Sequence, residues 1–310
     1  MSVSVADLVV SVADAGDARG MVDVIHAAFG ARPALDPRST AIDETPDSVR
    51  EVFGRGGSAI FATVARRPAG VILISEAGPG LATWSRVSVH PDFQRHGIAS
   101  TMVAAAEDWA AELGFRRAEL FARAELAELI AFWHHRGYGL ARPAAHGVIL
   151  TRELPVAVGV PTAEDMQRLG ARLATLLRPG DLVVASGELG AGKTTLTQGI
   201  GHGLGSAGPV ISPTFVLSRM HKSLTGAPDL LHVDAYRLSS AAEFDDLDLD
   251  EQAAEAITVV EWGSGLAEGL ADNRLEIDIR AAPDDHDGRV VLIRGVGRRW
   301  QHVDLREVDP

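Results

Sequence analysis

The chain has 310 residues, a length that favours two domains over one. Hydrophobic residues make up 46% and charged residues 23%, as in ordinary globular proteins, which excludes a fibrous, coiled-coil or wholly disordered chain. The absence of cysteine excludes disulfides, thiolate metal sites and a cysteine nucleophile, and the net charge of −13 disfavours a general surface for nucleic acid.

The sequence contains no apolar stretch of the ~18 to 20 residues that a membrane span needs, and its N-terminus lacks a basic start. We therefore expect a cytoplasmic protein without a signal peptide, without a membrane partner and without direct contact with DNA. Any RNA would be held by a partner protein, because the chain is acidic. Only two lysines, Lys193 and Lys222, occur among 29 basic residues, so a lysine within a motif has a chemical reason.

Hydrophobic periodicity predicts a domain of mixed helices and strands in the first half. In order, it predicts a helix at 17–29, strands at 58–64, 70–75 and 82–89, a helix at 97–113, a strand at 117–122, a helix at 125–136 and a strand at 148–152. Two prolines and a glycine within 152–161 predict a short extended linker with the boundary near Pro155. We expect domains at 1–155 and 156–310.

Alternating strands and helices continue in the second half. The pattern predicts helices at 163–177 and 193–204 and strands at 181–186, 216–219, 230–234, 257–261, 274–280 and 289–294. The predicted fold class is α/β in both domains, a mixed α/β domain followed by an α/β domain of the P-loop NTPase type.

A glycine-rich turn between the strand at 181–186 and the helix at 193–204 fits the pattern G-x-x-x-x-G-K-[ST]. Backbone N–H groups of such a turn surround phosphate oxygens, and the helix N-terminus adds its positive dipole end. The lysine then reaches the β- and γ-phosphates, and the hydroxyl of the next residue binds Mg²⁺. The predicted nucleotide-binding residues are Gly187, Glu188, Leu189, Gly190, Ala191, Gly192, Lys193, Thr194 and the adjoining Thr195.

Two predicted strands end in an acid at the same edge of the sheet, 230–234 in Asp234 and 257–261 in Glu261. A carboxylate at the end of a neighbouring strand commonly holds the Mg²⁺ of a bound nucleotide. Acids at strand ends also serve as helix caps or loop residues, so spacing alone does not choose between the two.

Residues 160 to 300 resemble the TsaE family, the ATPase component of the bacterial machinery that makes threonylcarbamoyladenosine in tRNA. The resemblance rests on four blocks in order: GELGAGKTT at 187–195, SPTFVL at 212–217, HVDAYRL at 232–238 and VVEWG at 259–263. It implies that Thr194 and Glu261 hold Mg²⁺ and that Asp234 is a catalytic or metal-associated acid. It further implies that Lys193 and Glu261 act in catalysis, and that the stretch near Pro161 and Thr162 lies by the adenine of ATP. It also implies that ATP hydrolysis resets a complex of TsaB and TsaD, which holds the tRNA.

The sequence leaves the role of one further segment of this half open and gives the histidines no special role. Ser212 and Thr214 either present a loop to the γ-phosphate or form a plain turn before a strand. His202, His221 and His232 have no metal-ligand spacing, and we interpret them as structural.

The first half resembles the GNAT family of N-acetyltransferases, best in its later part. The acetyl-CoA loop of that family, Q/R-x-x-G-x-G/A between a strand and a helix, corresponds here to Gln94, Arg95, His96, Gly97, Ile98 and Ala99, preceded by Val87 and Val89 on the strand. The segment AFWHHRGY at 131–138 resembles a later helix of the family. Backbone N–H groups of the loop are expected to bind the pyrophosphate of acetyl-CoA.

One position departs from the GNAT pattern, because Trp133 stands where a tyrosine often protonates the leaving thiolate. An indole N–H is far too weak an acid for that step. Tyr138 is expected in the core, whereas Glu119, His134 or a water remain as candidate proton carriers. The acceptor is not identified by the sequence. Two alternatives stay open: a GNAT-shaped docking module without chemistry, and a P-loop kinase whose small-molecule substrate the GNAT half also modifies.

Overall fold

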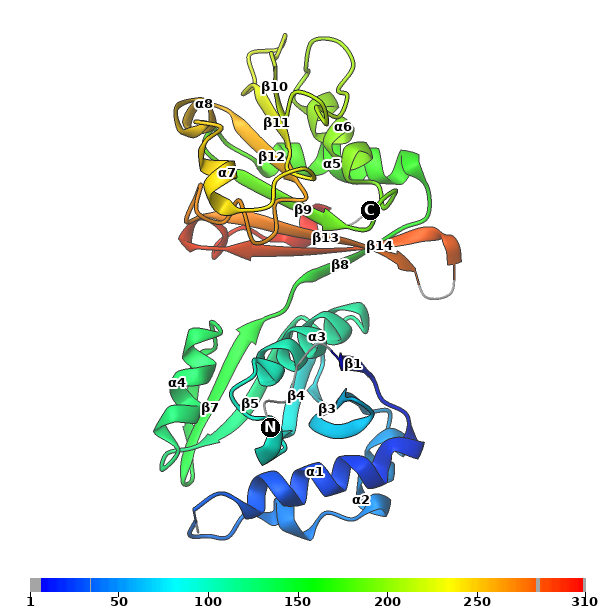
Figure 1. Cartoon of the computed structure of the whole chain (residues 1–310), viewed down its shortest axis with the longest axis vertical. Helices are drawn as coiled ribbons and strands as arrows, with labels where there is room; N and C mark the ends of the chain where they lie inside the picture. Colours follow the sequence, from blue (N-terminus) through cyan, green and yellow to red (C-terminus); the bar gives the residue numbers. More distant parts are fainter. Residues whose placement is uncertain (1–6, 34, 283–284, 309–310) are drawn as a thin grey trace. The chain divides into compact units, whose positions relative to one another are not determined.

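We describe the protein from a computed structural model, which defines residues 7–33, 35–282 and 285–308. The chain forms two compact units, Met1–Leu154 and Pro155–Pro310 (Figure 1). Each unit contains a seven-stranded sheet with helices on both faces. The predicted fold class, two successive α/β domains, is confirmed.

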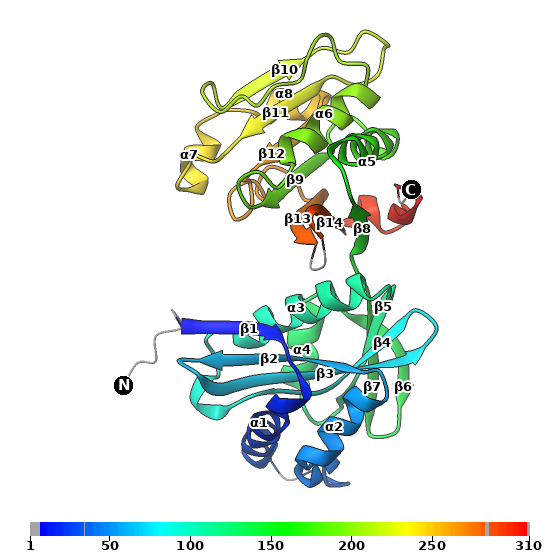
Figure 2. The same cartoon turned by 90° about the vertical axis from the view of Figure 1, so that its right-hand side faces the viewer.

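The sheet of the first unit has the order β1-β2-β3-β4-β5-β7-β6, and every neighbouring pair is antiparallel except β4 with β5. Helices α1 and α2 cover one face of this sheet and α3 the other (Figure 2). The elements are β1 Leu8–Val12, α1 Ala18–Gly30, α2 Pro46–Gly54, β2 Ser58–Val64, β3 Arg67–Gly78, β4 Leu81–Val89, α3 Ile98–Glu112, β5 Arg117–Arg123, α4 Ala127–His135, β6 Gly139–Ala144 and β7 Gly147–Glu153.

The parallel pair in this sheet is short. Strand β4 pairs with β5 only over Leu81–Trp84, although β4 continues to Val89. Just beyond the paired part, the register between β3 and β4 shifts, and Arg86 has a positive φ of 53°. A β-bulge bends its strand, so β4 turns away from β5 towards its carboxyl end.

The sheet of the second unit has the order β10-β11-β12-β9-β13-β14-β8. Strands β11, β12, β9 and β13 run parallel, and the outer pairs are antiparallel. The elements are β8 Val156–Val160, α5 Ala163–Leu176, β9 Leu182–Gly187, α6 Lys193–Gly203, β10 Ser218–His221, β11 Leu230–Asp234, α7 Ala241–Asp245, α8 Asp250–Glu255, β12 Ile257–Glu261, β13 Arg274–Ala282 and β14 Asp285–Val296.

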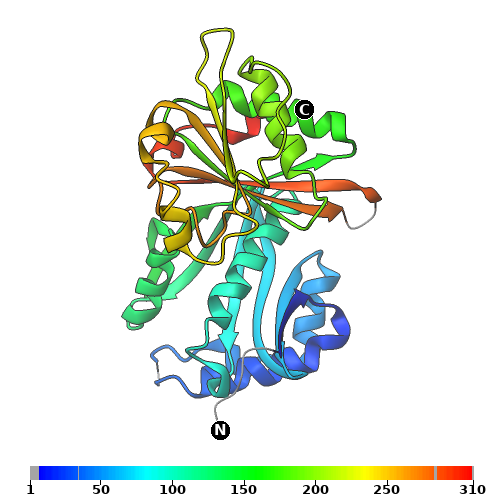
Figure 3. The same cartoon turned by 45° about the horizontal axis from the view of Figure 1, so that its top comes forward.

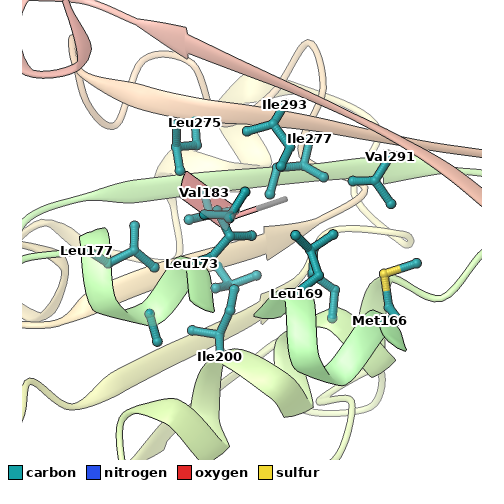
Figure 4. Packing of buried hydrophobic residues seen from close by; sticks show 14 of the residues in the cluster. Met166, Leu169, Leu173, Leu177, Val183, Ile200, Leu275, Ile277, Val291 and Ile293 are labelled. Carbon is teal, nitrogen blue, oxygen red and sulfur yellow. The ribbon is translucent and has the colours of Figure 1, made fainter. Parts of the chain in front are cut away.

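Two hydrophobic layers enclose the second sheet, with α5 and α6 on one face and α7 and α8 on the other (Figure 3). Since strand residues alternate between faces, Val183 packs towards α5 and α6, whereas Val184 packs towards the opposite layer. Met166, Leu169 and Leu173 project from one side of α5 into the first layer (Figure 4). Their spacing of three and four residues is the helical period that predicted α5.

Half of the segment predicted as an extended linker, Val156–Val160, is strand β8, which corrects that prediction. Val156, Val158 and Val160 are buried, and β8 pairs with β14 at the edge of the second sheet. The alternation of valines is a strand signal, which the flanking prolines obscured.

Five further elements were not predicted: β1, α2, β6, α7 and α8. All are short, and α7 and α8 lie in or beside an acidic stretch without clear periodicity. Helix α2 does carry a start signal, because Thr45 and Ser48 form a capping box around Pro46. Within the described ranges, no helix is long and apolar enough to cross a membrane.

Candidate functional site

The glycine-rich loop connects β9 to α6 at the carboxyl edge of the parallel strands. Gly187 has φ +138°, and a Cβ on it would lie 2.5 Å from the carbonyl oxygen of Ile279. Gly192 has φ +111° and is the N-cap of α6, which has no side-chain cap. Glycine is therefore required at both positions, and the first N–H groups of α6 are available to an anion.

Lys193 is buried at the start of α6. Its Nζ donates to the carbonyl oxygens of Gly187 and Glu188, at 2.8 Å each, and lies 3.6 Å from the ring centroid of Trp262. Burial lowers the pKa of Lys193, while the carboxylates of Glu261 and Asp234 act in the opposite direction. The ammonium group is thus held inside the loop that the motif predicted.

The structure brings Thr194, Glu261 and His232 together. The Thr194 hydroxyl donates to Oε2 of Glu261 at 2.9 Å, and Nε2 of His232 lies 2.7 Å from Oε1. His232 is fully buried and Glu261 is 3% exposed. The interpretation of His232 as merely structural missed this contact with the candidate Mg²⁺ ligand.

Asp234 lies beside Glu261 in the register of β11 and β12, but it has different partners. Its Oδ2 accepts hydrogen bonds from the hydroxyls of Ser212 (2.8 Å) and Thr214 (2.6 Å), and its Oδ1 accepts from the backbone N–H of Tyr236 (3.1 Å). The two hydroxyls therefore attach the 212–217 segment to the strand end that carries Asp234.

Aromatic side chains lie around these groups. The rings of Tyr236 and Trp262 are 5.1 Å apart, and the guanidinium of Arg237 lies 4.9 Å from the ring of Phe215. Phe215 is 86% exposed. Sequence reasoning gave Trp262 no role, because its place over Lys193 follows from the positive φ of 62° directly after β12, which residue spacing does not reveal.

The candidate nucleotide-binding residues outside the glycine-rich loop, Thr162 and Thr195, lie at the starts of helices α5 and α6. Thr162 is the N-cap of α5: its hydroxyl accepts from the N–H of Asp165 and bonds to the carboxylate of that residue. Met166, one turn further along α5, lies near Gly192. Thr195 is in the first turn of α6, and Thr197, which the sequence analysis omitted, donates to the carbonyl of Lys193 and lies 3.5 Å from Glu261.

The oxygen donors at this edge fit Mg²⁺. One hydroxyl and one carboxylate, from Thr194 and Glu261, are adjacent, and both are the hard ligands that Mg²⁺ prefers. No group of three or more His, Asp or Glu able to hold a metal occurs in the described part of the chain. A site with so few protein ligands suits a Mg²⁺ ion that also binds substrate phosphates, since Mg²⁺ usually takes only one or two carboxylates from protein.

The candidate acetyl-CoA loop precedes α3, a helix of 15 residues. Gly97 is its N-cap with φ +78°, and no side chain caps the helix. The Gln94 amide donates to the carbonyl of Val89 at 3.2 Å, so the loop is fixed to the end of β4. Arg95 has φ +65°, and Nδ1 of His96 lies 2.7 Å from the Gln94 carbonyl. Uncapped N–H groups at this helix start fit a pyrophosphate.

A cavity of about 290 Å³ lies in the first unit where β4 and β5 diverge. The residues that line it are Phe29, Arg32, Leu35, Arg38, Ser39, Thr40, Trp84, Ser85, Arg86, Val87, Leu120, Phe121, Arg123, Leu126, Leu129 and Trp133. Trp133 is 1% exposed and therefore presents its ring, and no phenol, to this space.

Tyr138, which was expected in the core, and the two candidate proton carriers Glu119 and His134 have structural partners. Trp84 donates to the Tyr138 oxygen (2.7 Å), whose O–H donates to Glu107 (3.1 Å), and burial raises the pKa of Tyr138. The two oxygens of Glu119 accept from Arg142. Nδ1 of His134 lies 2.9 Å from the carbonyl of Tyr138. None of these three residues is among those lining the cavity.

Comparison with known proteins finds a family match in each half. Residues 160–291 match the family model "Threonylcarbamoyl adenosine biosynthesis protein TsaE", and residues 28–138 match the acetyltransferase (GNAT) family. Both resemblances predicted from the sequence are confirmed by these matches.

Individual relatives agree with the TsaE family model. A TsaE protein of Streptomyces coelicolor is 55% identical over 143 residues, which cover 45% of this chain and 97% of the relative. The TsaE protein of Bacillus subtilis is 37% identical over 139 residues, which cover 44% of this chain and 84% of the relative. Among solved structures, the PaiA N-acetyltransferase of Thermoplasma acidophilum in complex with coenzyme A has 13% identity and a TM-score of 0.43, covering 47% of this chain and 98% of its own.

Proposed function

Because the chain belongs to the TsaE family, we propose that its second unit is the ATPase of the machinery that makes threonylcarbamoyladenosine in tRNA. The observation that carries this proposal is the hydrogen bond between Thr194 and Glu261 directly behind the phosphate loop. A hydroxyl from the loop and a carboxylate from the neighbouring strand form the usual protein share of a nucleotide-bound Mg²⁺ site.

Each residue of the site has a distinct role in this proposal. N–H groups of residues 187–194 donate to the phosphate oxygens of ATP, and the Lys193 ammonium leaves its two carbonyl partners to contact the β- and γ-phosphates. Thr194 and Glu261 hold Mg²⁺, which neutralises charge on those phosphates. Thr162 and the start of α5 lie beside the adenine.

Asp234 acts on the attacking water rather than on the metal. Its carboxylate holds Ser212 and Thr214, so it fixes the 212–217 segment close to the strand edge where the phosphates end. In hydrolysis the water oxygen bonds to the γ-phosphorus, the bond to the β,γ-bridging oxygen breaks, and ADP and inorganic phosphate leave. Asp234 orients the water for this in-line attack.

The chain does not transfer the threonylcarbamoyl group in this proposal. It binds TsaB- and TsaD-like proteins, which hold the tRNA, and ATP hydrolysis resets their complex between turnovers. The acidic composition supports this division, since an acidic surface is unsuited to hold tRNA phosphates itself.

ATP hydrolysis by the full chain, measured alone and with a purified TsaB–TsaD pair, tests the proposal. We expect hydrolysis to rise strongly when the pair is added. The same experiment separates the competing small-molecule kinase: a chain that consumes ATP with a metabolite, and is indifferent to the pair, would be a kinase.

A second activity is supported for the first unit, acetyl transfer from acetyl-CoA to an amine. The uncapped start of α3 and the divergence of β4 from β5 favour it, together with the family match over residues 28–138. In this proposal Val87 and Val89 on β4 and the Gln94–Ala99 loop bind acetyl-CoA, while a water carries the proton that Trp133 cannot. Calorimetry of the full chain with acetyl-CoA tests binding, and Gly97→Trp, which fills the loop, is expected to abolish it.

A further inference from the structure

The charged side chains that line the cavity of the first unit are all positive. Four arginines line it, Arg32, Arg38, Arg86 and Arg123, and no aspartate or glutamate does. A cationic acceptor such as a polyamine or a lysine side chain would find no counter-charge there. Uncompensated positive charge at the cavity also favours the uncharged form of a nearby amine, which is the form that attacks a thioester.

Three of these arginines already have carboxylate partners outside the cavity lining. The ion pairs are Arg38 with Asp43 at 2.5 Å, Arg86 with Glu44 at 2.6 Å and Arg123 with Glu125 at 2.7 Å. Their charge is largely compensated within the protein.

Arg32 differs from the other three. In the part of the chain that the structure describes, no carboxylate forms an ion pair with it. Its guanidinium lies 3.8 Å from the ring centroid of Phe29 and 3.4 Å from the carbonyl oxygen of Val87. Burial alone lowers the pKa of Arg32, as expected for a half-buried cation without a counter-charge.

Most of the remaining lining is apolar, and Ser39, Thr40 and Ser85 add hydroxyl groups. Phe29, Leu35, Trp84, Leu120 and Trp133 contribute aromatic and aliphatic surface. A volume of about 290 Å³ accommodates a single amino acid rather than a folded protein segment. An apolar pocket with one uncompensated guanidinium is complementary to a ligand with an apolar body and one carboxylate.

We propose that this cavity binds a free aromatic or branched-chain amino acid as the acetyl acceptor, with its carboxylate paired to Arg32. The inference rests on the proposed acetyl transfer and names its substrate class. The amine nitrogen bonds to the acetyl carbon as the carbon–sulfur bond breaks, and the proton lost by nitrogen passes through water to the thiolate. The products are an N-acetyl amino acid and coenzyme A. Because Arg32 contacts Val87, the carboxylate is held beside the strand assigned to acetyl-CoA.

Binding of two product pairs to the full chain tests the inference without requiring turnover. N-acetyl-phenylalanine is compared with N-acetyl-phenethylamine, and N-acetyl-leucine with N-acetyl-isoamylamine, where each second compound lacks only the carboxylate. We expect the carboxylate-bearing member of at least one pair to bind about tenfold more tightly, and Arg32→Gln to bind both members equally. Arg55→Gln is the control, since Arg55 is 80% exposed, is paired with Glu51 and lies outside the cavity lining, and it should keep the preference.

Equal binding within both pairs, no binding of any of the four compounds, or a preference that survives Arg32→Gln would overturn the inference. Release of coenzyme A from acetyl-CoA with phenylalanine, leucine and the two bare amines separates it from the proposed acetyl transfer. Faster acetylation of the bare amines refutes the carboxylate site and leaves acetyl transfer standing. Arg32-dependent binding of the N-acetyl amino acids, without any binding of acetyl-CoA, would support the carboxylate site and refute the proposed acetyl transfer.

Discussion

Nε2 of His232 lies 2.7 Å from Oε1 of Glu261, in a buried position two residues before Asp234 on the adjacent strand. The other oxygen of Glu261 accepts from Thr194. A hydrogen bond to a metal-binding carboxylate orients it, so in the proposed Mg²⁺ site we expect His232 to position Glu261.

Replacing His232 with leucine is expected to raise the Mg²⁺ concentration for half-maximal ATP hydrolysis by about tenfold, because Glu261 loses its fixed orientation. His232→Gln, which keeps a donor, should recover part of the loss. His202→Gln is the control, since His202 is exposed on α6. A lowered unfolding temperature with an unchanged Mg²⁺ midpoint would leave His232 with a structural role only.

Lys193→Ala is expected to reduce ATP hydrolysis in the presence of TsaB and TsaD by about 10² to 10³-fold, because phosphate charge in the transition state loses its ammonium partner. The matched control is Lys222→Ala, since Lys222 is the other lysine of the chain, is 73% exposed and pairs with Asp229. Hydrolysis at the parental rate by a folded Lys193→Ala variant would refute the phosphate-loop assignment.

The two strand-end acids are expected to respond differently to amide substitution. Glu261→Gln and Thr194→Ala should weaken the Mg²⁺ dependence of nucleotide binding, because each removes an oxygen ligand or its charge. Asp234→Asn should leave nucleotide affinity within about twofold and lower turnover, because Asp234 holds Ser212 and Thr214. Nucleotide titrations with and without Mg²⁺ measure this; an unaltered metal dependence in Glu261→Gln would transfer the ligand role to Asp234.

Tyr138→Phe is expected to destabilise the first unit by about 1 to 3 kcal/mol, because Trp84 and Glu107 lose a buried partner. The pKa of Tyr138 is raised by burial, so the native state holds the phenol proton more tightly than the unfolded state does. That stability is complete below the ordinary tyrosine pKa of about 10 and declines as pH rises above it.

Urea unfolding of the parent and Tyr138→Phe at about pH 8 and about pH 10.5 measures both effects. The parent should lose more stability than the variant on going to the higher pH. An equal loss in the two proteins would mean that Tyr138 does not contribute to the alkaline sensitivity.

The phosphate loop and the two strand ends were predictable because their signals are local. A strand, a glycine-rich turn and a helix follow one another in sequence, and each acid ends an apolar run. Such contiguous patterns depend little on the remainder of the fold.

The contact between His232 and Glu261 depends on register. In the parallel pair of β11 and β12, His232 is opposite Val259, which makes it a diagonal neighbour of Glu261 on the same face. Residue spacing along one strand carries no information on that alignment. The same reason explains why Arg32 escaped notice, because its position beside Val87 arises from packing between α1 and β4.

The most direct measurement is the number of threonylcarbamoyladenosine residues formed in tRNA per TsaB–TsaD complex, with ATP, Mg²⁺ and the threonylcarbamoyl donor in excess. We predict that the complex alone stops near one product each, and that adding this chain allows many turnovers, whereas adding Lys193→Ala does not. Many turnovers without the chain, or equal support from Lys193→Ala, would contradict its proposed role as the ATPase that resets the complex.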